Sequence, residues 1–223
     1  ALTDEERQAC IERDPLKYGN LDGIDMASRD KANRLALYGR DEAKRVYEKN
    51  MLNGALNGYE INDLASAYYR AERDLMDLQK IDEQLRTKKA SDGTPLSLLA
   101  LDTSGEQVKA AVAVGDVDHA QHVANFTPGM GTNVRESLAN YVDVADRMRD
   151  NTEDQAGVEL SDVAVVAWLN YDAPTDVTKT FDPSVASTEK AHEGADRLAG
   201  FLTGVRTWRN EQGGSLHLTS IGH

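Results

Sequence analysis

Five short apolar segments follow residue 90, and long helical patterns separate the last three of them. A turn at Thr103–Glu106 joins the first two segments, which predicts an antiparallel hairpin. Residues 133–149 and 188–208 place apolar side chains at helical spacing between the later segments. This alternation predicts an α/β fold with a mostly parallel sheet that is covered by helices on both faces. The five segments lie near residues 96–102, 108–115, 121–126, 162–169 and 215–221.

The first 90 residues contain almost no strand-like pattern. Thr3 to Glu6 match a capping box at the start of a helix, and Asp14-Pro15 ends or bends that helix. Apolar residues in 61–88 recur at spacings of three and four, which predicts one long helix. We therefore predict two parts: a helical N-terminal region or cap at residues 1–90, and an α/β core at residues 91–223.

The charge of the chain is uneven along its length. Its 223 residues carry a formal net charge of −13. Residues 1–90 hold 16 Lys and Arg against 18 Asp and Glu, whereas residues 91–223 hold 9 against 20. Such an acidic second part would repel phosphate backbones, so we expect no nucleic-acid partner. No run of about 18 apolar residues is present, so we expect no membrane span.

The single cysteine, Cys10, excludes an internal disulfide and a cysteine-based zinc site. It leaves the cellular compartment unassigned. Asp116, Asp118, His119 and His122 lie close together in the sequence, but they lack the second carboxylate–histidine pair that would favour a metal site. We predict neither a metal nor a cofactor.

The segment Ser215–His223 has the pattern of a nucleophile elbow. Leu216, Leu218 and Ile221 predict a short buried strand that follows a Gly213-Gly214 turn. Gly222 and His223 then match the first two positions of G-x-S-x-G, in which the serine occupies a strained turn and exposes its oxygen. The serine would be the next residue, and the printed sequence stops before it.

A glycine-rich stretch, Thr127–Thr132, lies between the third strand and the following helix. In a hydrolase, an amide of such a loop joins an amide of the elbow to hold a developing oxyanion. On this interpretation Gly129 and Met130 form part of an oxyanion hole. A phosphate-binding loop is a weaker alternative, because Val134 stands where G-x-G-x-x-G needs glycine. A plain glycine turn is the remaining alternative.

The stretch Asn170–Pro174 follows the fourth strand, at the sheet edge where open α/β folds bind ligands. Tyr171 and Asp172 are therefore candidates for a substrate pocket, although an aspartate after a strand is also a common turn former. In the hydrolase order, the acid and the histidine of a catalytic triad come after the serine. We therefore expect none of the five histidines of this chain to act as general base; they are His119, His122, His192, His217 and His223.

Several motifs together resemble an actinobacterial α/β-hydrolase family long catalogued as a domain of unknown function. They are Asn20–Ile24, Arg29–Arg34, Phe126–Thr132, Tyr171–Pro174 and Thr219–His223. In that family the last segment continues as G-H-S-Y-G. The resemblance implies a serine hydrolase that acts on small-molecule esters, with Gly129 and Met130 near the oxyanion hole and His223 beside the nucleophile.

The sequence thus predicts the first half of an α/β-hydrolase core, with a Ser-Asp/Glu-His triad that lies beyond residue 223. The chain alone is expected to be inactive and to present an unpaired strand edge. Three explanations for the ending are open: a second chain completes the fold, the serine carries a covalent modification, or the polypeptide is truncated. The alternative function is a catalytically inactive binding or scaffold protein built on a hydrolase-like sheet.

Overall fold

The computed structural model describes residues 3–39, 61–105, 107–174 and 189–222, with side chains described outside residues 61–72. Its N-terminal helices are α1 (Asp4–Arg13), α2 (Pro15–Gly19), an unlabelled helix at residues 26–39, and α4 (Ile61–Thr87). The strands are β1 (Ser97–Asp102), β2 (Lys109–Val114), β3 (His122–Thr127), β4 (Val163–Leu169) and β5 (His217–Gly222). Between them lie α5 (Val134–Ala156), a 3-10 turn η1 (Leu160–Asp162) and α6 (Glu189–Glu211).

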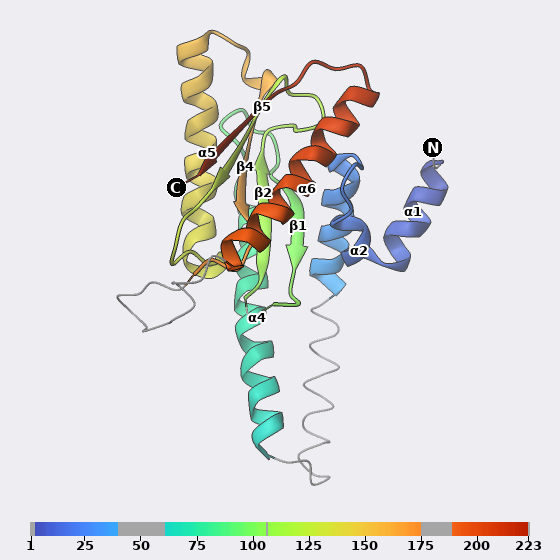
Figure 1. Ribbon diagram of the computed structural model, residues 1–223, viewed down its shortest axis with the longest axis vertical. Helices are drawn as coiled ribbons and strands as arrows, with labels where there is room; N and C mark the ends of the chain where they lie inside the picture. The colour runs from blue at the N-terminus through green and yellow to red at the C-terminus, as the bar shows by residue number, and fades with distance from the viewer. Residues whose placement is uncertain (1–2, 40–60, 106, 175–188, 223) are drawn as a thin grey trace.

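The strands form one sheet in the order β1-β2-β4-β3-β5 (Figure 1). The predicted hairpin is confirmed, because β1 and β2 pair antiparallel. β2 also runs antiparallel to β4, whereas β3 is parallel to both β4 and β5. Four strands therefore point the same way and only β2 is reversed, which agrees with the predicted, mostly parallel sheet.

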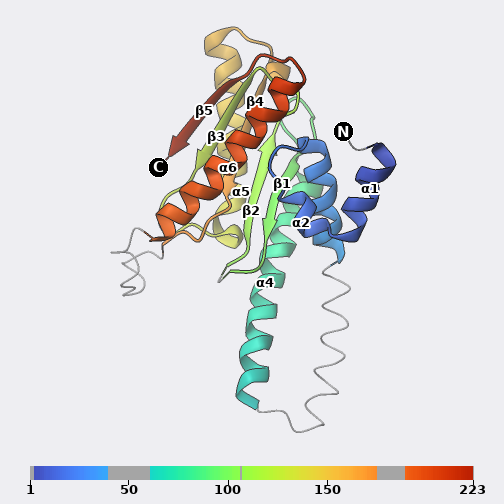
Figure 2. The same cartoon turned by 45° about the vertical axis from the view of Figure 1, so that its right-hand side comes forward.

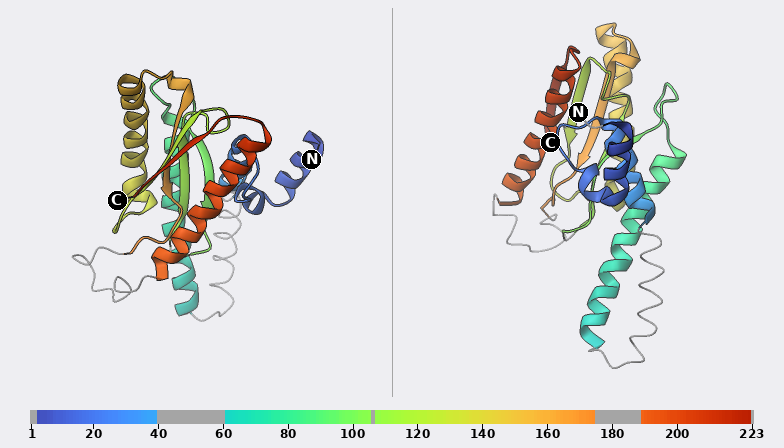
Figure 3. Two further views of the ribbon diagram at one scale, coloured as in Figure 1. Left: turned by 45° about the horizontal axis from the view of Figure 1, so that its top comes forward. Right: turned by 90° about the vertical axis from the view of Figure 1, so that its right-hand side faces the viewer.

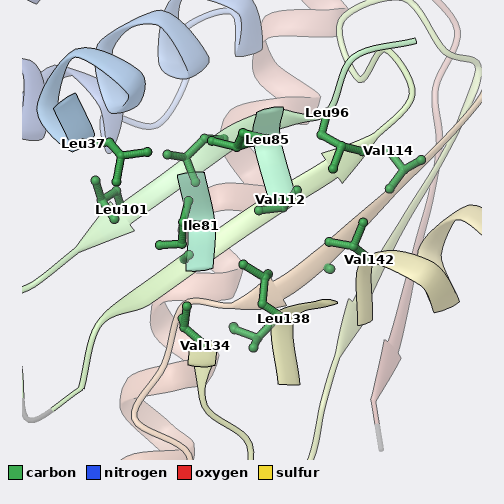
Figure 4. Packing of buried hydrophobic residues seen from close by; sticks show 14 of the residues in the cluster. Leu37, Ile81, Leu85, Leu96, Leu101, Val112, Val114, Val134, Leu138 and Val142 are labelled. Atoms are coloured by element: carbon green, nitrogen blue, oxygen red, sulfur yellow. The ribbon is translucent and has the colours of Figure 1, made fainter. Parts of the chain in front are cut away.

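Helices cover the two faces of the sheet, as the alternation of strands and helices predicts. In Figure 3, right, the sheet lies between α6, coloured orange to red, and α5, coloured yellow. α4 and α5 pack on one face through Ile81, Leu85, Leu138 and Val142 (Figure 4). α6 packs on the other face, where Phe201 lies 4.7 Å from Trp168 of β4 between ring centroids.

A β-bulge in β1 changes which face of the sheet its side chains pack on. The pairing of β1 with β2 shifts register between Leu98 and Ala100. As a result Leu98 and Leu101 contribute to the core under α4 and α5, and Leu99 and Ala100 contribute to the core under α6. Strict alternation would have placed Leu98 and Leu101 on opposite faces.

The local signals at helix ends are also confirmed. Thr3 and Glu6 form the predicted capping box of α1, and Pro15 begins α2 directly after α1 ends. α5 runs seven residues past the predicted end at residue 149 and stops at Gly157, which has a positive φ of 64°. A left-handed residue of this kind is the usual end of a helix, and glycine adopts it without strain.

The free edge of β1 is covered by polar side chains from the N-terminal region. Asn20 donates to Leu101 O and accepts from its amide, so it replaces part of a neighbouring strand. Residues of the helix at 26–39 continue the pattern: Arg29 donates to Leu99 O and Asn33 donates to Leu98 O. These bonds satisfy backbone groups that an edge strand would otherwise expose.

The prediction that β5 is buried is wrong. The strand forms at the expected place, but its residues are exposed or half-buried. The physical reason is its position, because β5 is the last strand of the sheet and pairs only with β3 among the described residues (Figure 2). No helix in the described part of the chain is long and apolar enough to cross a membrane.

Candidate active site

Three segments meet where the parallel strands end. β3, β4 and β5 run in the same direction, so their carboxyl ends lie along one edge of the sheet. The glycine loop, Thr127–Thr132, leaves β3 at this edge, and the 170–174 loop leaves β4 beside it. Thr127 pairs directly with Gly222, the last residue of β5. The structure therefore brings the first residue of the predicted oxyanion loop next to Gly222, the first position of the predicted elbow.

The glycine loop has a conformation that depends on Gly131. This residue has a φ of 79° and donates its amide to Pro174 O at 2.8 Å. The Thr132 hydroxyl donates to Gly129 O at 2.8 Å and closes the loop on itself. The N–H groups of Gly129 and Met130 donate to no described residue, and the Met130 side chain is 51% exposed. Within the described part of the chain, no acceptor therefore competes with a ligand oxygen for these amides.

Tyr171 joins the 170–174 loop to the glycine loop. Its hydroxyl lies 2.5 Å from Pro128 O and 3.3 Å from Gly129 O, and it donates to these carbonyls. Burial raises the pKa of this hydroxyl above its ordinary value of 10.0, so the group stays protonated and remains a donor at neutral pH. The side chain lies against Gly194 of α6, where an added Cβ would stand only 3.0 Å from Tyr171 Cβ.

Asp172 belongs to a chain of ion pairs at the same edge. Its carboxylate is 3.1 Å from Lys109 Nζ, and this lysine is 3.6 Å from Asp102. Asp102 in turn accepts from Arg197 of α6 at 2.7 Å. Burial alone would raise the pKa of Asp102, but hydrogen bonds from Ser104 and Arg197 and the charge of Lys109 outweigh it and lower that pKa well below 3.8.

These contacts give Tyr171 and Asp172 roles that sequence reasoning did not anticipate. Both were predicted to line a substrate pocket, and that role stays a prediction. The structure places the Tyr171 hydroxyl on the backbone of the glycine loop and the Asp172 carboxylate on a buried lysine. Two bonds, Tyr171 to Pro128 and Gly131 to Pro174, therefore hold the glycine loop in place.

Lys109 and Arg197 were missed by the sequence analysis. Lys109 is 2% exposed and opens the strand Lys-Ala-Ala-Val-Ala-Val, so a single charge in an otherwise apolar strand was the available signal. Arg197 lies on α6 among many charged residues and carries no such signal. Its partner Asp102 is 95 residues away in the sequence, so only the fold brings the two together.

The structure also shows where the predicted elbow glycine, two of the histidines and the Asp116–His122 cluster lie. Gly222 is exposed and an added Cβ there would meet no atom within 4 Å, while His223 lies outside the described residues. His122 and His217 stack across β3 and β5 with ring centroids 5.1 Å apart. Asp118 accepts from the amides of Met26 and Ala27 and so caps the helix at 26–39. Within the described residues, no three His, Cys, Asp or Glu side chains gather as a metal site would require.

The strand order, the reversed β2, the glycine loop after β3 and the sequence Gly222-His223 at the end of β5 are typical of an α/β hydrolase. The chain belongs to the alpha/beta hydrolase family, whose sequence model matches residues 102–223, more than half of its length. The match begins at the end of β1 and includes the glycine loop, the 170–174 loop and β5.

Among individual proteins, the chain is similar to uncharacterized protein Rv2079 of Mycobacterium tuberculosis, with 29% identity over 253 residues that cover 100% of this chain and 34% of that protein. It is also similar to uncharacterized protein Rv0963c of M. tuberculosis and Mb0988c of M. bovis, each with 33% identity over 67% of this chain and 54% of the relative. The chain thus spans about a third of the first relative's length. No solved structure gives a significant match.

Proposed function

We propose that this chain supplies the first half of an acyl hydrolase that cleaves small-molecule esters with a serine nucleophile. The observation that carries the proposal is the pairing of Thr127 with Gly222, which sets the glycine loop beside the place where an elbow serine would follow His223. Family membership supports the same chemistry. The named relatives are uncharacterized and supply no substrate.

The proposed mechanism is acyl transfer through a covalent intermediate. The serine oxygen attacks the ester carbonyl while a histidine takes its proton, and the alcohol leaves after it receives that proton. Water then attacks the acyl-enzyme by the same route and releases the acid. The amides of Gly129 and Met130 are proposed to donate to the oxyanion, together with an amide of the elbow.

The serine, the acid and the histidine of this proposal lie outside the 223 residues. We propose that they belong to a stretch of polypeptide that would follow His223, or to a second chain that would complete the sheet. Tyr171 then acts as a positioning residue, because it fixes the backbone of the glycine loop without needing to touch the substrate.

Labelling with a fluorophosphonate probe, read by intact mass, tests this function. The 223-residue chain is expected to take up no probe. A longer protein that continues past His223 is expected to take up one equivalent and to hydrolyse a p-nitrophenyl ester. Replacement of the serine after His223 by alanine should abolish both signals.

A longer protein that is folded but neither reacts with the probe nor cleaves esters would sink the proposal. That result would favour the alternative function, a binding or scaffold protein that keeps the hydrolase sheet without its chemistry. Circular dichroism of the wild-type protein and the alanine variant shows whether each is folded. This control distinguishes a variant that has lost its nucleophile from one that has unfolded.

A further inference from the structure

A cavity of about 690 Å³ lies apart from the glycine loop, between α2, α6 and the carboxyl ends of β1 and β4. In Figures 1 and 2, α2 lies beside β1 and α6 runs obliquely across the sheet. The volume is within the usual range for small-molecule sites. α6 approaches the N-terminal region closely here, because an added Cβ at Gly200 or Gly204 would meet Asp22 or the Gly23 amide at 2.6 Å or less.

The charges that line the cavity are balanced and mostly paired. Its basic residues are Lys17, Arg29 and Arg197, and its acidic residues are Asp14, Asp22 and Asp102. Arg29 pairs with Asp22 at 3.1 Å, and Arg197 pairs with Asp102 at 2.7 Å. A lining with no net charge gives neither an anion nor a cation a Coulombic advantage. The ligand that fits it best is therefore neutral.

Asn170 provides a polar group that lacks a partner in the protein. The residue is 7% exposed and lines the cavity, and its Oδ1, which has almost no accessible surface, accepts no hydrogen bond from any described residue. Leaving a buried amide oxygen unpaired is costly, and such atoms normally have a protein, water or ligand partner. The oxygen is closed off from the cavity in this structure, and a rotation of the side chain would present it to a hydroxyl group of a ligand.

Apolar side chains complete the lining. Leu101, Trp168 and Phe201 border the same space, and the Arg29 guanidinium lies 5.1 Å from the Phe201 ring centroid. Hydroxyl-binding groups next to apolar surface match a molecule with polar edges and C–H faces. We propose that this cavity binds a neutral polyhydroxylated compound, a sugar or polyol.

The cavity and the candidate active site are lined by consecutive residues, Asn170 and Tyr171. Asn170 lines the cavity, and Tyr171 binds the carbonyl of Pro128 in the glycine loop. The sugar or polyol would thus be the alcohol part of the ester substrate. This last assignment rests on the proposed function, whereas binding of the free compound does not.

Isothermal titration calorimetry with methyl α-D-glucopyranoside on the full-length protein tests the proposal, with glucose 6-phosphate and 1-butanol as charged and apolar comparisons. Saturable binding of the glucoside is expected. Asn170→Leu and Arg197→Gln should each weaken it about tenfold, since each removes hydrogen-bonding groups from the cavity.

Arg135→Gln is the matched control, because the partly exposed Arg135 pairs with the buried Asp77 at 3.1 Å in a different cavity. It should leave binding unchanged. The proposal is overturned if the folded protein binds no glucoside, if it prefers glucose 6-phosphate or 1-butanol, or if the control loses as much affinity as Asn170→Leu. Fluorophosphonate labelling without sugar binding would reject this site alone. Sugar binding without labelling would reject the proposed hydrolase alone.

Discussion

Two buried arginine side chains donate hydrogen bonds to backbone carbonyls at or next to the start of a strand. Arg149 of α5 is 1% exposed and donates to Val163 O at the start of β4. Arg209 of α6 is 4% exposed and donates to Ser215 O just before β5. Burying a charge is costly unless it is paired and hydrogen-bonded. Arg149 also pairs with Asp92 at 2.9 Å, and Arg209 also donates to Asp118 O, so both guanidinium groups have several partners.

Tyr171→Phe tests the link between the two loops. The change removes only the hydroxyl that binds Pro128 O and Gly129 O, so the free energy of unfolding should fall by about 1 kcal/mol. Urea denaturation of the wild type and the variant measures this change in the free energy of unfolding. Tyr141→Phe is the control, because the Tyr141 ring packs on Phe126 and its hydroxyl bonds to no described residue. Equal losses in both variants would contradict a specific role for Tyr171.

Asp92 gives the protein a predictable response to acid. Burial opposes ionisation of this carboxyl, but bonds with Arg149 and Thr94 lower its pKa from 3.8 to about 2. A folded-state pKa below the unfolded one means that ionised Asp92 stabilises the fold above about pH 4. That contribution is lost as the pH falls toward 2.

Urea titrations of the wild-type protein and Asp92→Asn at several pH values measure this effect. The wild type should be more stable near pH 6, and its advantage should shrink steadily between about pH 4 and pH 2. Asp150→Asn is a comparison on the surface of α5, where the carboxylate accepts from the Ser91 hydroxyl. A gap for Asp92→Asn that stays constant with pH would show that its ionisation does not stabilise the fold.

At the scale of elements, the helix at residues 26–39 replaces a missing strand neighbour of β1. Its side chains bind successive backbone groups of that strand, and Leu98 shows both halves of the pattern. Its amide donates to Asp30 and its carbonyl accepts from Asn33. The family-like motif at Arg29–Arg34 is therefore explained by edge capping.

Asn33→Ala tests this explanation. Asn33 is fully buried and its amide bridges Gly19 O and Leu98 O, so the change removes one bond from each carbonyl and leaves Gly19 O with its bond from Arg29. The free energy of unfolding should fall by about 2 to 3 kcal/mol. Leu35→Ala lies on the same helix with 41% of its side chain exposed, and it should cost less than about 1 kcal/mol. Thermal or urea unfolding distinguishes the two.

Elements were predictable wherever a local signal was strong. The capping box of α1, the β1–β2 hairpin and the long α4, α5 and α6 all follow from short stretches of sequence. The exposure of β5 was not predictable in this way. An apolar alternation fixes which residues share a face of a strand, but the number of neighbours depends on the whole sheet.

In the candidate site too, the sequence predicted some features and not others. The glycine loop and the Gly222 position were recognisable from their glycines, and strand direction alone brings them to one edge. The bonds that hold the loop were not visible, because Tyr171 meets Pro128 across 43 residues and Lys109 meets Asp172 across 63. Such pairs become neighbours only through the pairing of β2, β3 and β4.

At the scale of the whole molecule, the burial of the strands declines across the sheet from its centre to β5. Every residue of β2 and β4 is buried, and both strands have partners on each side. β3 is partly buried, and β5 is exposed or half-buried with only β3 beside it in the described chain. Strands with fewer partners and less cover open by smaller fluctuations.

Amide hydrogen exchange of the 223-residue chain should follow this gradient. Amides of β2 and β4 are expected to exchange only through global unfolding, and those of β5 through local opening that is faster by about 100-fold or more. Exchange measured at two denaturant concentrations separates the routes, because global opening accelerates with denaturant and local opening changes little. β5 amides as slow and as denaturant-sensitive as those of β4 would mean that the edge of the sheet is covered in solution, by a second copy of the chain or by another part of it.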